Sequence, residues 1–228
     1  MPVNKKSYEQ IIADLGSHHV TLVAVSKTKS VEEIKELYDL GQKDFGENYV
    51  QELATKQAQL PKDIRWHFIG HLQGNKVKQI APFIHLIQSV ESYRLLQKIN
   101  KEGLKNDRVI ECLLQVHIAQ EETKFGLDEN ELNELINMNS DEPASPAGRL
   151  HELKNVQIRG LMGMASFTDD MKKVRAEFKH LKSIFDMLQT LNSEFRTLSM
   201  GMSADYPIAI EEGSTMIRIG SLIFGARD

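Results

Sequence analysis

Lys27 has the clearest chemical potential in the sequence, because it directly follows the strand-like run VTLVAVS at residues 20–26. A lysine amine attacks an aldehyde only after it loses its proton. An ordinary lysine pKa near 10.4 must therefore be lowered by burial or by a nearby positive charge. Position alone favours a solvated lysine at a strand end, since the chain holds 28 basic residues. A second cation close to Lys27 would instead favour a Schiff base.

Arg218 supplies a candidate for that second cation. It lies within the run MIRIGS, where apolar residues flank it on both sides. A charged group inside an apolar strand needs a partner. The structural alternative to a functional role is a salt bridge with Asp205, Glu211 or Glu212.

Two loops of small residues follow the last two strand-like runs. The first contains Ser199, Gly201 and Ser203, and the second contains Gly220 and Ser221. Glycines allow a phosphate to approach closely, while serine hydroxyls and exposed backbone amides donate to it. The two loops together predict a phosphate cup. Each loop by itself is equally consistent with ordinary turn chemistry.

Strand-like and helix-like runs alternate along the chain. The expected strands cover residues 20–26, 43–46, 64–70, 85–90, 108–118, 156–165, 197–202 and 216–224. The expected helices cover residues 31–41, 47–60, 75–83, 92–103, 128–138, a long segment containing 174–191, and 207–213.

This alternation predicts an α/β fold in which parallel strands close into a (β/α)8 TIM barrel, with an open doubly wound sheet as the alternative. In such a barrel the active site lies at the carboxyl ends of the strands, and the eighth strand pairs with the first. Lys27 and Arg218 are therefore expected to lie near each other.

Composition limits the possible functions. The 228 residues are 41% apolar and 26% charged, which is typical of one globular domain over residues 1–228. A net charge of -4 without a basic stripe argues against nucleic acid as a partner. No apolar run approaches the roughly 20 residues of a membrane span. Cys112 is the single cysteine, which excludes an intrachain disulfide and favours the cytoplasm. The segment Asn139–Gly148 is expected to be a mobile loop.

Several motifs together resemble a known family. They are AVSKTK around Lys27, FGENYVQE around Asn48, WHFIGHLQGNK around His71, GLMGM around Met162 and the terminal run SMGMSADYPIAIEEGSTMIRIGSLIFGARD. Dispersed from residue 27 to residue 228, they are similar to the pyridoxal phosphate homeostasis proteins, which are single-domain relatives of the alanine racemase N-terminal barrel domain.

The resemblance implies pyridoxal 5'-phosphate (PLP) as cofactor. It implies that Lys27 forms the Schiff base and that Arg218 approaches the pyridine nitrogen. Asn48 would line the cofactor pocket. The phosphate would be held by Ser203 together with the backbones of three further residues: Met202, Gly220 and Ser221. Position 221 holds serine where threonine is more frequent in the family, and both side chains carry a hydroxyl.

The resemblance and the residues together favour a PLP carrier in vitamin B6 homeostasis over an enzyme. A permanently protonated Arg218 discourages protonation of the pyridine nitrogen and weakens the cofactor as an electron sink. Alanine racemases also take a second base from an additional domain, which is not expected in a chain ending at Asp228. The alternatives are an amino-acid racemase or lyase of the same fold, and a lysine-dependent aldolase acting on a sugar phosphate. PLP, other B6 vitamers and apo PLP enzymes are the implied partners of a cytoplasmic monomer.

The remaining reactive side chains favour structural roles. His67 and His71 would lie about 13 Å apart in an extended strand, too far to share one metal, so no metal site is expected. Cys112 sits in an apolar run and is expected to be an inert core residue. The methionines of GLMGM and SMGM fit either barrel packing or the lining of the cofactor pocket.

Overall fold

Eight parallel strands form a closed barrel in the order β1-β2-β3-β4-β5-β6-β7-β8. The computed structural model describes residues 3–16, 18–119, 126–136, 150 and 152–225. The strands are β1 Thr21–Val25, β2 Asp44–Glu47, β3 Arg65–Phe68, β4 Leu86–Val90, β5 Ile110–Val116, β6 Val156–Gly163, β7 Thr197–Ser199 and β8 Met216–Ile219. The predicted TIM barrel is confirmed, and the open sheet is wrong.

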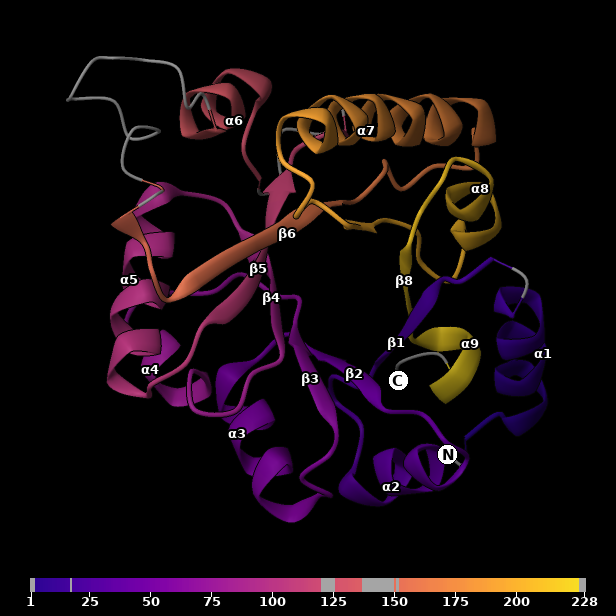
Figure 1. Ribbon diagram of the computed structural model, residues 1–228. Helices are drawn as coiled ribbons and strands as arrows, with labels where there is room; N and C mark the ends of the chain where they lie inside the picture. The colour runs from indigo at the N-terminus through magenta and orange to yellow at the C-terminus, as the bar shows by residue number, and fades with distance from the viewer. Residues whose placement is uncertain (1–2, 17, 120–125, 137–149, 151, 226–228) are drawn as a thin grey trace.

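Helices surround the barrel on its outer side (Figure 1). They are α1 Lys5–Leu15, α2 Val31–Asp39, α3 Val50–Gln59, α4 Val77–Ile80, α5 Tyr93–Lys105, α6 Glu129–Ile136, α7 Met171–Leu191, α8 Tyr206–Glu211 and α9 Ser221–Phe224. None of the described helices is both long enough and apolar enough to cross a bilayer. The predicted loop Asn139–Gly148 lies outside the described residues.

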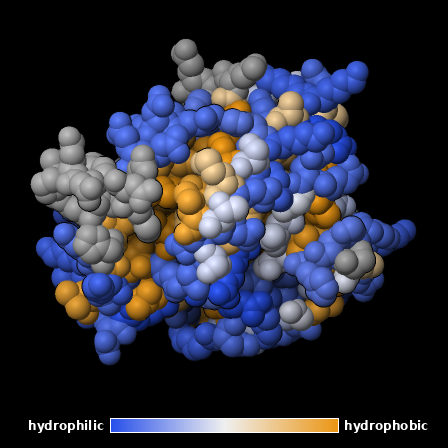
Figure 2. All heavy atoms as spheres, turned by 45° about the horizontal axis from the view of Figure 1, so that its top comes forward, coloured by the Kyte–Doolittle hydropathy of each residue, from blue (hydrophilic) through white to orange (hydrophobic). Residues whose placement is uncertain are grey.

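The core has two parts. A small inner cluster fills the barrel and consists of Val23, Leu86, Leu113, Met162 and Met216. A much larger cluster lies between the strands and the surrounding helices. Each fully buried aliphatic side chain contributes roughly 1.5 to 3 kcal/mol. Hydrophilic side chains cover most of the molecular face in Figure 2, with hydrophobic ones visible between them.

Several sequence-based boundaries were wrong, three of them close to the predicted site residues. Glu47 ends β2 and does not begin a helix, because α3 starts only at Val50. The seventh strand stops at Ser199, and the chain then turns through Gly201, whose φ of +96° favours glycine. The eighth strand stops at Ile219, and residues 221–224 form the short helix α9.

Candidate functional site

The predicted neighbourhood of Lys27 and Arg218 is formed by the closure of the barrel. Strand β1 pairs with β8, and Val23 lies opposite Arg218 in the register. Lys27 lies in the turn that follows β1 and is half-buried, whereas Arg218 is only 3% exposed. Lys27 therefore follows one strand, and Arg218 lies on its neighbour, although the two residues come from opposite ends of the sequence.

A buried ion-pair cluster holds the turn that carries Lys27. Lys56 of α3 is 4% exposed, and its Nζ donates to the Ser26 carbonyl oxygen at 2.7 Å. The same ammonium contacts Glu47 Oε1 at 2.8 Å and Glu52 Oε1 at 2.6 Å. Because burial is the largest influence on Glu47, its pKa is raised, and Lys56 opposes that rise. The cluster fixes the residue immediately before Lys27.

The residue after Lys27 is held by the same cluster. The backbone N–H of Thr28 donates to Glu52 Oε1 at 2.6 Å. Thr28 has a φ of +66°, a left-handed conformation that is unusual for a β-branched residue. Helix α2 then begins at once, with Ser30 and Glu33 forming a reciprocal capping box. Both neighbours of Lys27 are thus fixed by hydrogen bonds. The sequence reasoning missed Lys56, whose only visible signal was its i,i+4 spacing from Glu52.

Arg218 is held by hydrogen bonds and not by Glu211 or Glu212, two of the three salt-bridge partners considered as the structural alternative. Its Nη1 donates to Ser199 Oγ at 2.6 Å, and its Nη2 donates to the Gly163 carbonyl oxygen at 3.0 Å. Glu211 and Glu212 instead pair with Arg175 of α7. Burial lowers the pKa of Arg218 to about 10, partly opposed by attraction to Asp205. The guanidinium therefore remains charged at neutral pH.

The two small-residue loops do lie against each other. The Gly220 N–H approaches Ser203 Oγ at 3.4 Å, which links the loop after β7 to the loop after β8. Ser221 is the first residue of α9 and is exposed. Met202 fits its predicted role less directly, because its backbone N–H donates to Asp205 Oδ1 at 2.6 Å. That amide would have to leave Asp205 before it could bind a phosphate.

Asn48 also lies at the carboxyl end of the barrel. It directly follows β2, and its Oδ1 is buried without a hydrogen-bond partner among the described residues. Such an atom costs free energy unless a ligand or water completes its hydrogen bonding. Gly70 packs directly against the backbone of Asn48. Any larger residue would clash there, since a Cβ at position 70 would lie 2.4 Å from the Asn48 carbonyl oxygen.

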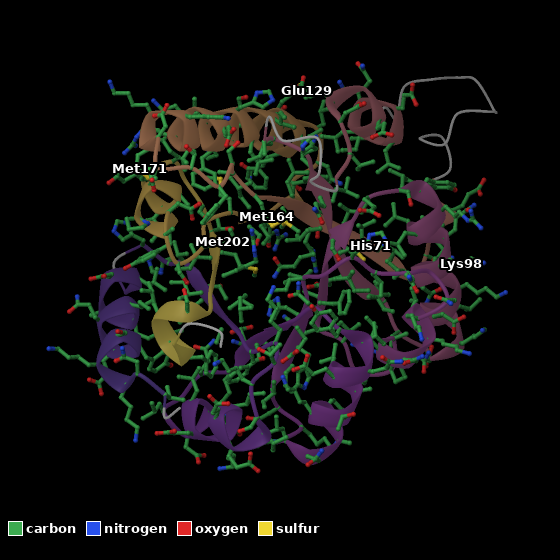
Figure 3. All side chains as sticks on the ribbon, turned by 180° about the vertical axis from the view of Figure 1, so that it is seen from behind. His71, Lys98, Glu129, Met164, Met171 and Met202 are labelled. Carbon is green, nitrogen blue, oxygen red and sulfur yellow. The ribbon has the colours of Figure 1, made fainter. Side chains whose placement is uncertain are left out.

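The methionines of the two motifs differ in burial. Met162 and Met200 are at most 1% exposed and belong to the core. Met164 is half-buried and Met202 is 37% exposed. Figure 3 shows Met164 and Met202 near the middle of the view, with His71 further toward the side on which Lys98 lies on an outer helix. The packing residues and the rim residues therefore alternate within each motif.

His67 does not stand alone inside the barrel. It lies beside Asp44 and His85, and ligand atoms of these three residues lie within 4.8 Å of one another. The sequence reasoning considered only the spacing of His67 from His71, and His71 instead contacts Glu91 at 2.9 Å. Cys112 is fully buried, as expected, and burial raises the pKa of its thiol.

A cavity of about 550 Å³ lies away from this site. Its lining includes Val156 and Ile158 near the start of β6 and Leu188 of α7. Ile136 and Leu150 also border it, and these residues flank a part of the chain that the structure does not describe. We place the candidate site not in this cavity but at the carboxyl ends of the strands, where Lys27 and Asn48 follow β1 and β2.

Comparison with known proteins identifies the family of the chain. The family model described as alanine racemase, N-terminal domain, matches residues 5–228. A pyridoxal phosphate homeostasis protein of Aquifex aeolicus is 40% identical over 217 residues, covering 94% of this chain and 90% of that protein.

Two solved structures match this chain over nearly its whole length. PipY of Synechococcus elongatus, solved with PLP bound, is 35% identical with a TM-score of 0.81, covering 95% of this chain and 99% of that one. Alanine racemase of Bartonella henselae is 16% identical with a TM-score of 0.67, covering 95% of this chain and 56% of that one, and shows a similar fold.

Proposed function

Because the chain belongs to the pyridoxal phosphate homeostasis protein family, we propose that it binds PLP as a Schiff base on Lys27 and serves vitamin B6 homeostasis. The observation that carries this proposal is the pairing of β1 with β8, which places Arg218 on the strand next to the one that Lys27 follows. The PLP named in the PipY structure supports the same cofactor here. When bound, PLP supplies an aldehyde that condenses with a lysine amine, and water is released.

The residues of the site fit the two ends of this cofactor. Arg218 retains N–H donors, because its two described hydrogen bonds use only two of the five in a guanidinium. Those donors suit an unprotonated pyridine nitrogen. Ser203 offers a hydroxyl and Ser221 a backbone amide for the phosphate, while the Gly220 amide would have to exchange its hydrogen bond to Ser203 Oγ for one to the phosphate. Asn48 offers an acceptor at the side of the pocket.

The same arginine argues for binding rather than catalysis. A protonated Arg218 disfavours a positive charge on the pyridine nitrogen, and that charge is what makes PLP a strong electron sink. We therefore infer a carrier or buffer of PLP. An amino-acid racemase or lyase is the second candidate, since the alanine racemase barrel shares this fold. A lysine-dependent sugar-phosphate aldolase is the third, because the Ser203 and Gly220 loops suit any phosphate ester.

Borohydride reduction tests the site of attachment. The protein is incubated with PLP, reduced, digested and analysed by mass spectrometry. A pyridoxyl adduct on the Lys27 peptide is expected, whereas an adduct only on exposed lysines such as Lys98 would contradict the proposal. A sugar adduct on Lys27 after incubation with sugar phosphates would support the aldolase.

Exchange of substrate protons separates a carrier from an enzyme. The PLP-loaded protein is incubated with L-amino acids in deuterated water. A carrier should exchange the α-proton no faster than free PLP does, while rapid exchange would favour the racemase or lyase. We further infer that the protein is a cytoplasmic monomer that binds other B6 vitamers and delivers PLP to apo enzymes. Transfer to an apo enzyme in the presence of a scavenger of free PLP tests direct delivery.

A further inference from the structure

A continuous chain of side-chain hydrogen bonds crosses the inside of the barrel. Arg218 Nη1 donates to Ser199 Oγ at 2.6 Å, and Ser199 Oγ contacts Gln88 Oε1 at 2.7 Å. Gln88 Nε2 lies 3.0 Å from His67 Nδ1, and His67 Nε2 lies 3.0 Å from Asp44 Oδ1. These residues come from β8, β7, β4, β3 and β2, which follow one another around the barrel except for β5 and β6 (Figure 1).

The hydrogen bonds run in one direction along the chain. A guanidinium has donors only, so Ser199 accepts from Arg218, and its hydroxyl hydrogen is donated to Gln88 Oε1. Because the carbonyl oxygen of Gln88 faces Ser199, its amide nitrogen is turned toward His67. His67 Nδ1 must accept, so the ring proton lies on Nε2 and is donated to Asp44. The chain thus fixes one tautomer of His67.

Water cannot easily replace any member of this chain. Ser199 and Gln88 are fully buried, and His67 is 1% exposed. A break would leave a donor or an acceptor unpaired inside the barrel, which is more costly than a broken surface hydrogen bond. A single orientation of Arg218 therefore satisfies the whole chain.

The far end of the chain is anchored at the opposite end of the barrel. Arg65 Nε donates to Asp44 Oδ1 at 2.7 Å, and a second guanidinium nitrogen contacts Asp44 Oδ2. Asp44 thus accepts from Arg65 and from His67 in the same arrangement. A metal ion on Asp44, His67 and His85 would have to displace the His67 proton and compete with Arg65, so we read these groups as part of the hydrogen-bond chain.

We propose that Ser199, Gln88 and His67 are positioning residues that hold the Arg218 guanidinium in one orientation toward the cofactor. This inference rests on the proposed binding of PLP. The Gly163 carbonyl oxygen provides a second tether on Nη2, so the two hydrogen bonds together fix the plane of the guanidinium. The remaining N–H groups are held ready for the pyridine nitrogen before PLP enters. Loss of the chain should weaken PLP binding without removing any group that touches PLP.

The variant Gln88→Met tests the chain at its middle. It retains a side chain of similar length but cannot bond to Ser199 or His67. The matched control is Gln42→Met, because Gln42 is also buried but its Nε2 donates to two backbone carbonyl oxygens, those of Leu22 and Asp44, so the change removes no side-chain hydrogen bond of the chain. For each variant, PLP affinity and the absorption maximum of bound PLP are measured.

In Gln88→Met we expect about tenfold weaker PLP binding and a shifted absorption maximum, because a charged hydrogen-bonding group loses its fixed geometry. Gln42→Met should keep the wild-type affinity and spectrum. If the wild-type protein takes up no PLP, the proposed function fails. If the wild type binds PLP and Gln88→Met has the same affinity and spectrum, the positioning role alone is overturned.

Nitrogen-15 NMR of histidine in the apo wild-type protein tests the chain without PLP and without a variant. The His67 signals, assigned by comparison with His67→Gln, should report the neutral tautomer protonated at Nε2. A proton on Nδ1 at neutral pH would contradict the derived direction. This measurement remains decisive even if Gln88→Met does not fold.

Discussion

Lys56 Nζ lies 2.7 Å from the Ser26 carbonyl oxygen, so a buried ammonium from α3 fixes the residue immediately before Lys27. Two carboxylates, Glu47 and Glu52, share the same ammonium. The reactive amine of the candidate site therefore projects from a turn that is anchored by a second lysine, which itself points into the space between the strands and α3.

Replacing Lys56 with methionine should strongly destabilise the protein. The change leaves Glu47 buried without its cation, and breaking a buried pair in this way costs about 3 to 5 kcal/mol. Urea denaturation gives the free energy of unfolding. Lys35→Met is the control, because Lys35 pairs with Asp39 on the surface, and should cost less than about 1 kcal/mol.

The double variant Lys56→Met with Glu47→Leu separates charge burial from packing. Removing both charges should recover part of the stability lost in the single variant, because no uncompensated carboxylate remains. A double variant that is less stable than Lys56→Met would show that the two residues act independently.

Asp44→Asn should lower stability in a pH-dependent manner. Burial alone would raise the pKa of Asp44, but hydrogen bonds from Arg65 and His67 outweigh it and lower the pKa from 3.8 to about 2. The ionised form therefore contributes about 2 kcal/mol. This stabilisation is fully present above about pH 4 and is lost as the pH falls through 2. Urea denaturation across this range should show a gap between the two proteins that narrows with acid. A constant gap would refute the assignment.

Gly201→Ala should damage both the fold and the phosphate cup. Gly201 has a φ of +96°, and a Cβ there would lie 2.6 Å from the Ala209 Cβ. Gly41 is a matched control, because its φ is +104° but no atom lies within 4 Å of a new Cβ. Gly41→Ala should cost about 1 kcal/mol from backbone strain alone. Gly201→Ala should cost more in urea denaturation and should also weaken PLP binding. Equal costs would mean that the close contact with α8 is unimportant.

Ser203→Ala tests the phosphate cup through the ligand. Ser203 Oγ lies beside the Gly220 amide, where a phosphate oxygen would gain a charged hydrogen bond. Its loss should weaken PLP binding about tenfold. Pyridoxal, which lacks the phosphate, should bind the variant and the wild type equally. Fluorescence titration with the two ligands makes the comparison, and an equal loss for both would place Ser203 outside the cup.

The sequence allowed the barrel to be predicted and the site residues to be proposed, because both depend on local signals. Apolar runs mark the strands, and Lys27, Gly220 and Ser221 follow such runs directly. The supporting contacts could not be predicted, since they join residues from different strands. Nothing near Gln88 in the sequence indicates Ser199 as its partner, and only the closed barrel brings them within 2.7 Å.

Exact ends of elements were also beyond local reasoning. The apolar run after Ser221 has the composition of a strand, yet it forms α9, where Ile223 and Phe224 pack into the core. The interior position of Lys56 was equally hidden. A lysine four residues after a glutamate usually indicates a surface pair, whereas here Glu47 draws it between β2 and α3.

The pairing of β1 with β8 has a consequence for the order of events during folding. Lys27 and Arg218 lie near opposite ends of the polypeptide, and the pairing of β1 with β8 is the contact that closes the barrel. A partly folded or incompletely synthesised chain can therefore present the lysine but not the arginine beside it. Under the proposed function, only molecules with a closed barrel would bind PLP stably. The visible absorption of bound PLP would therefore report barrel closure.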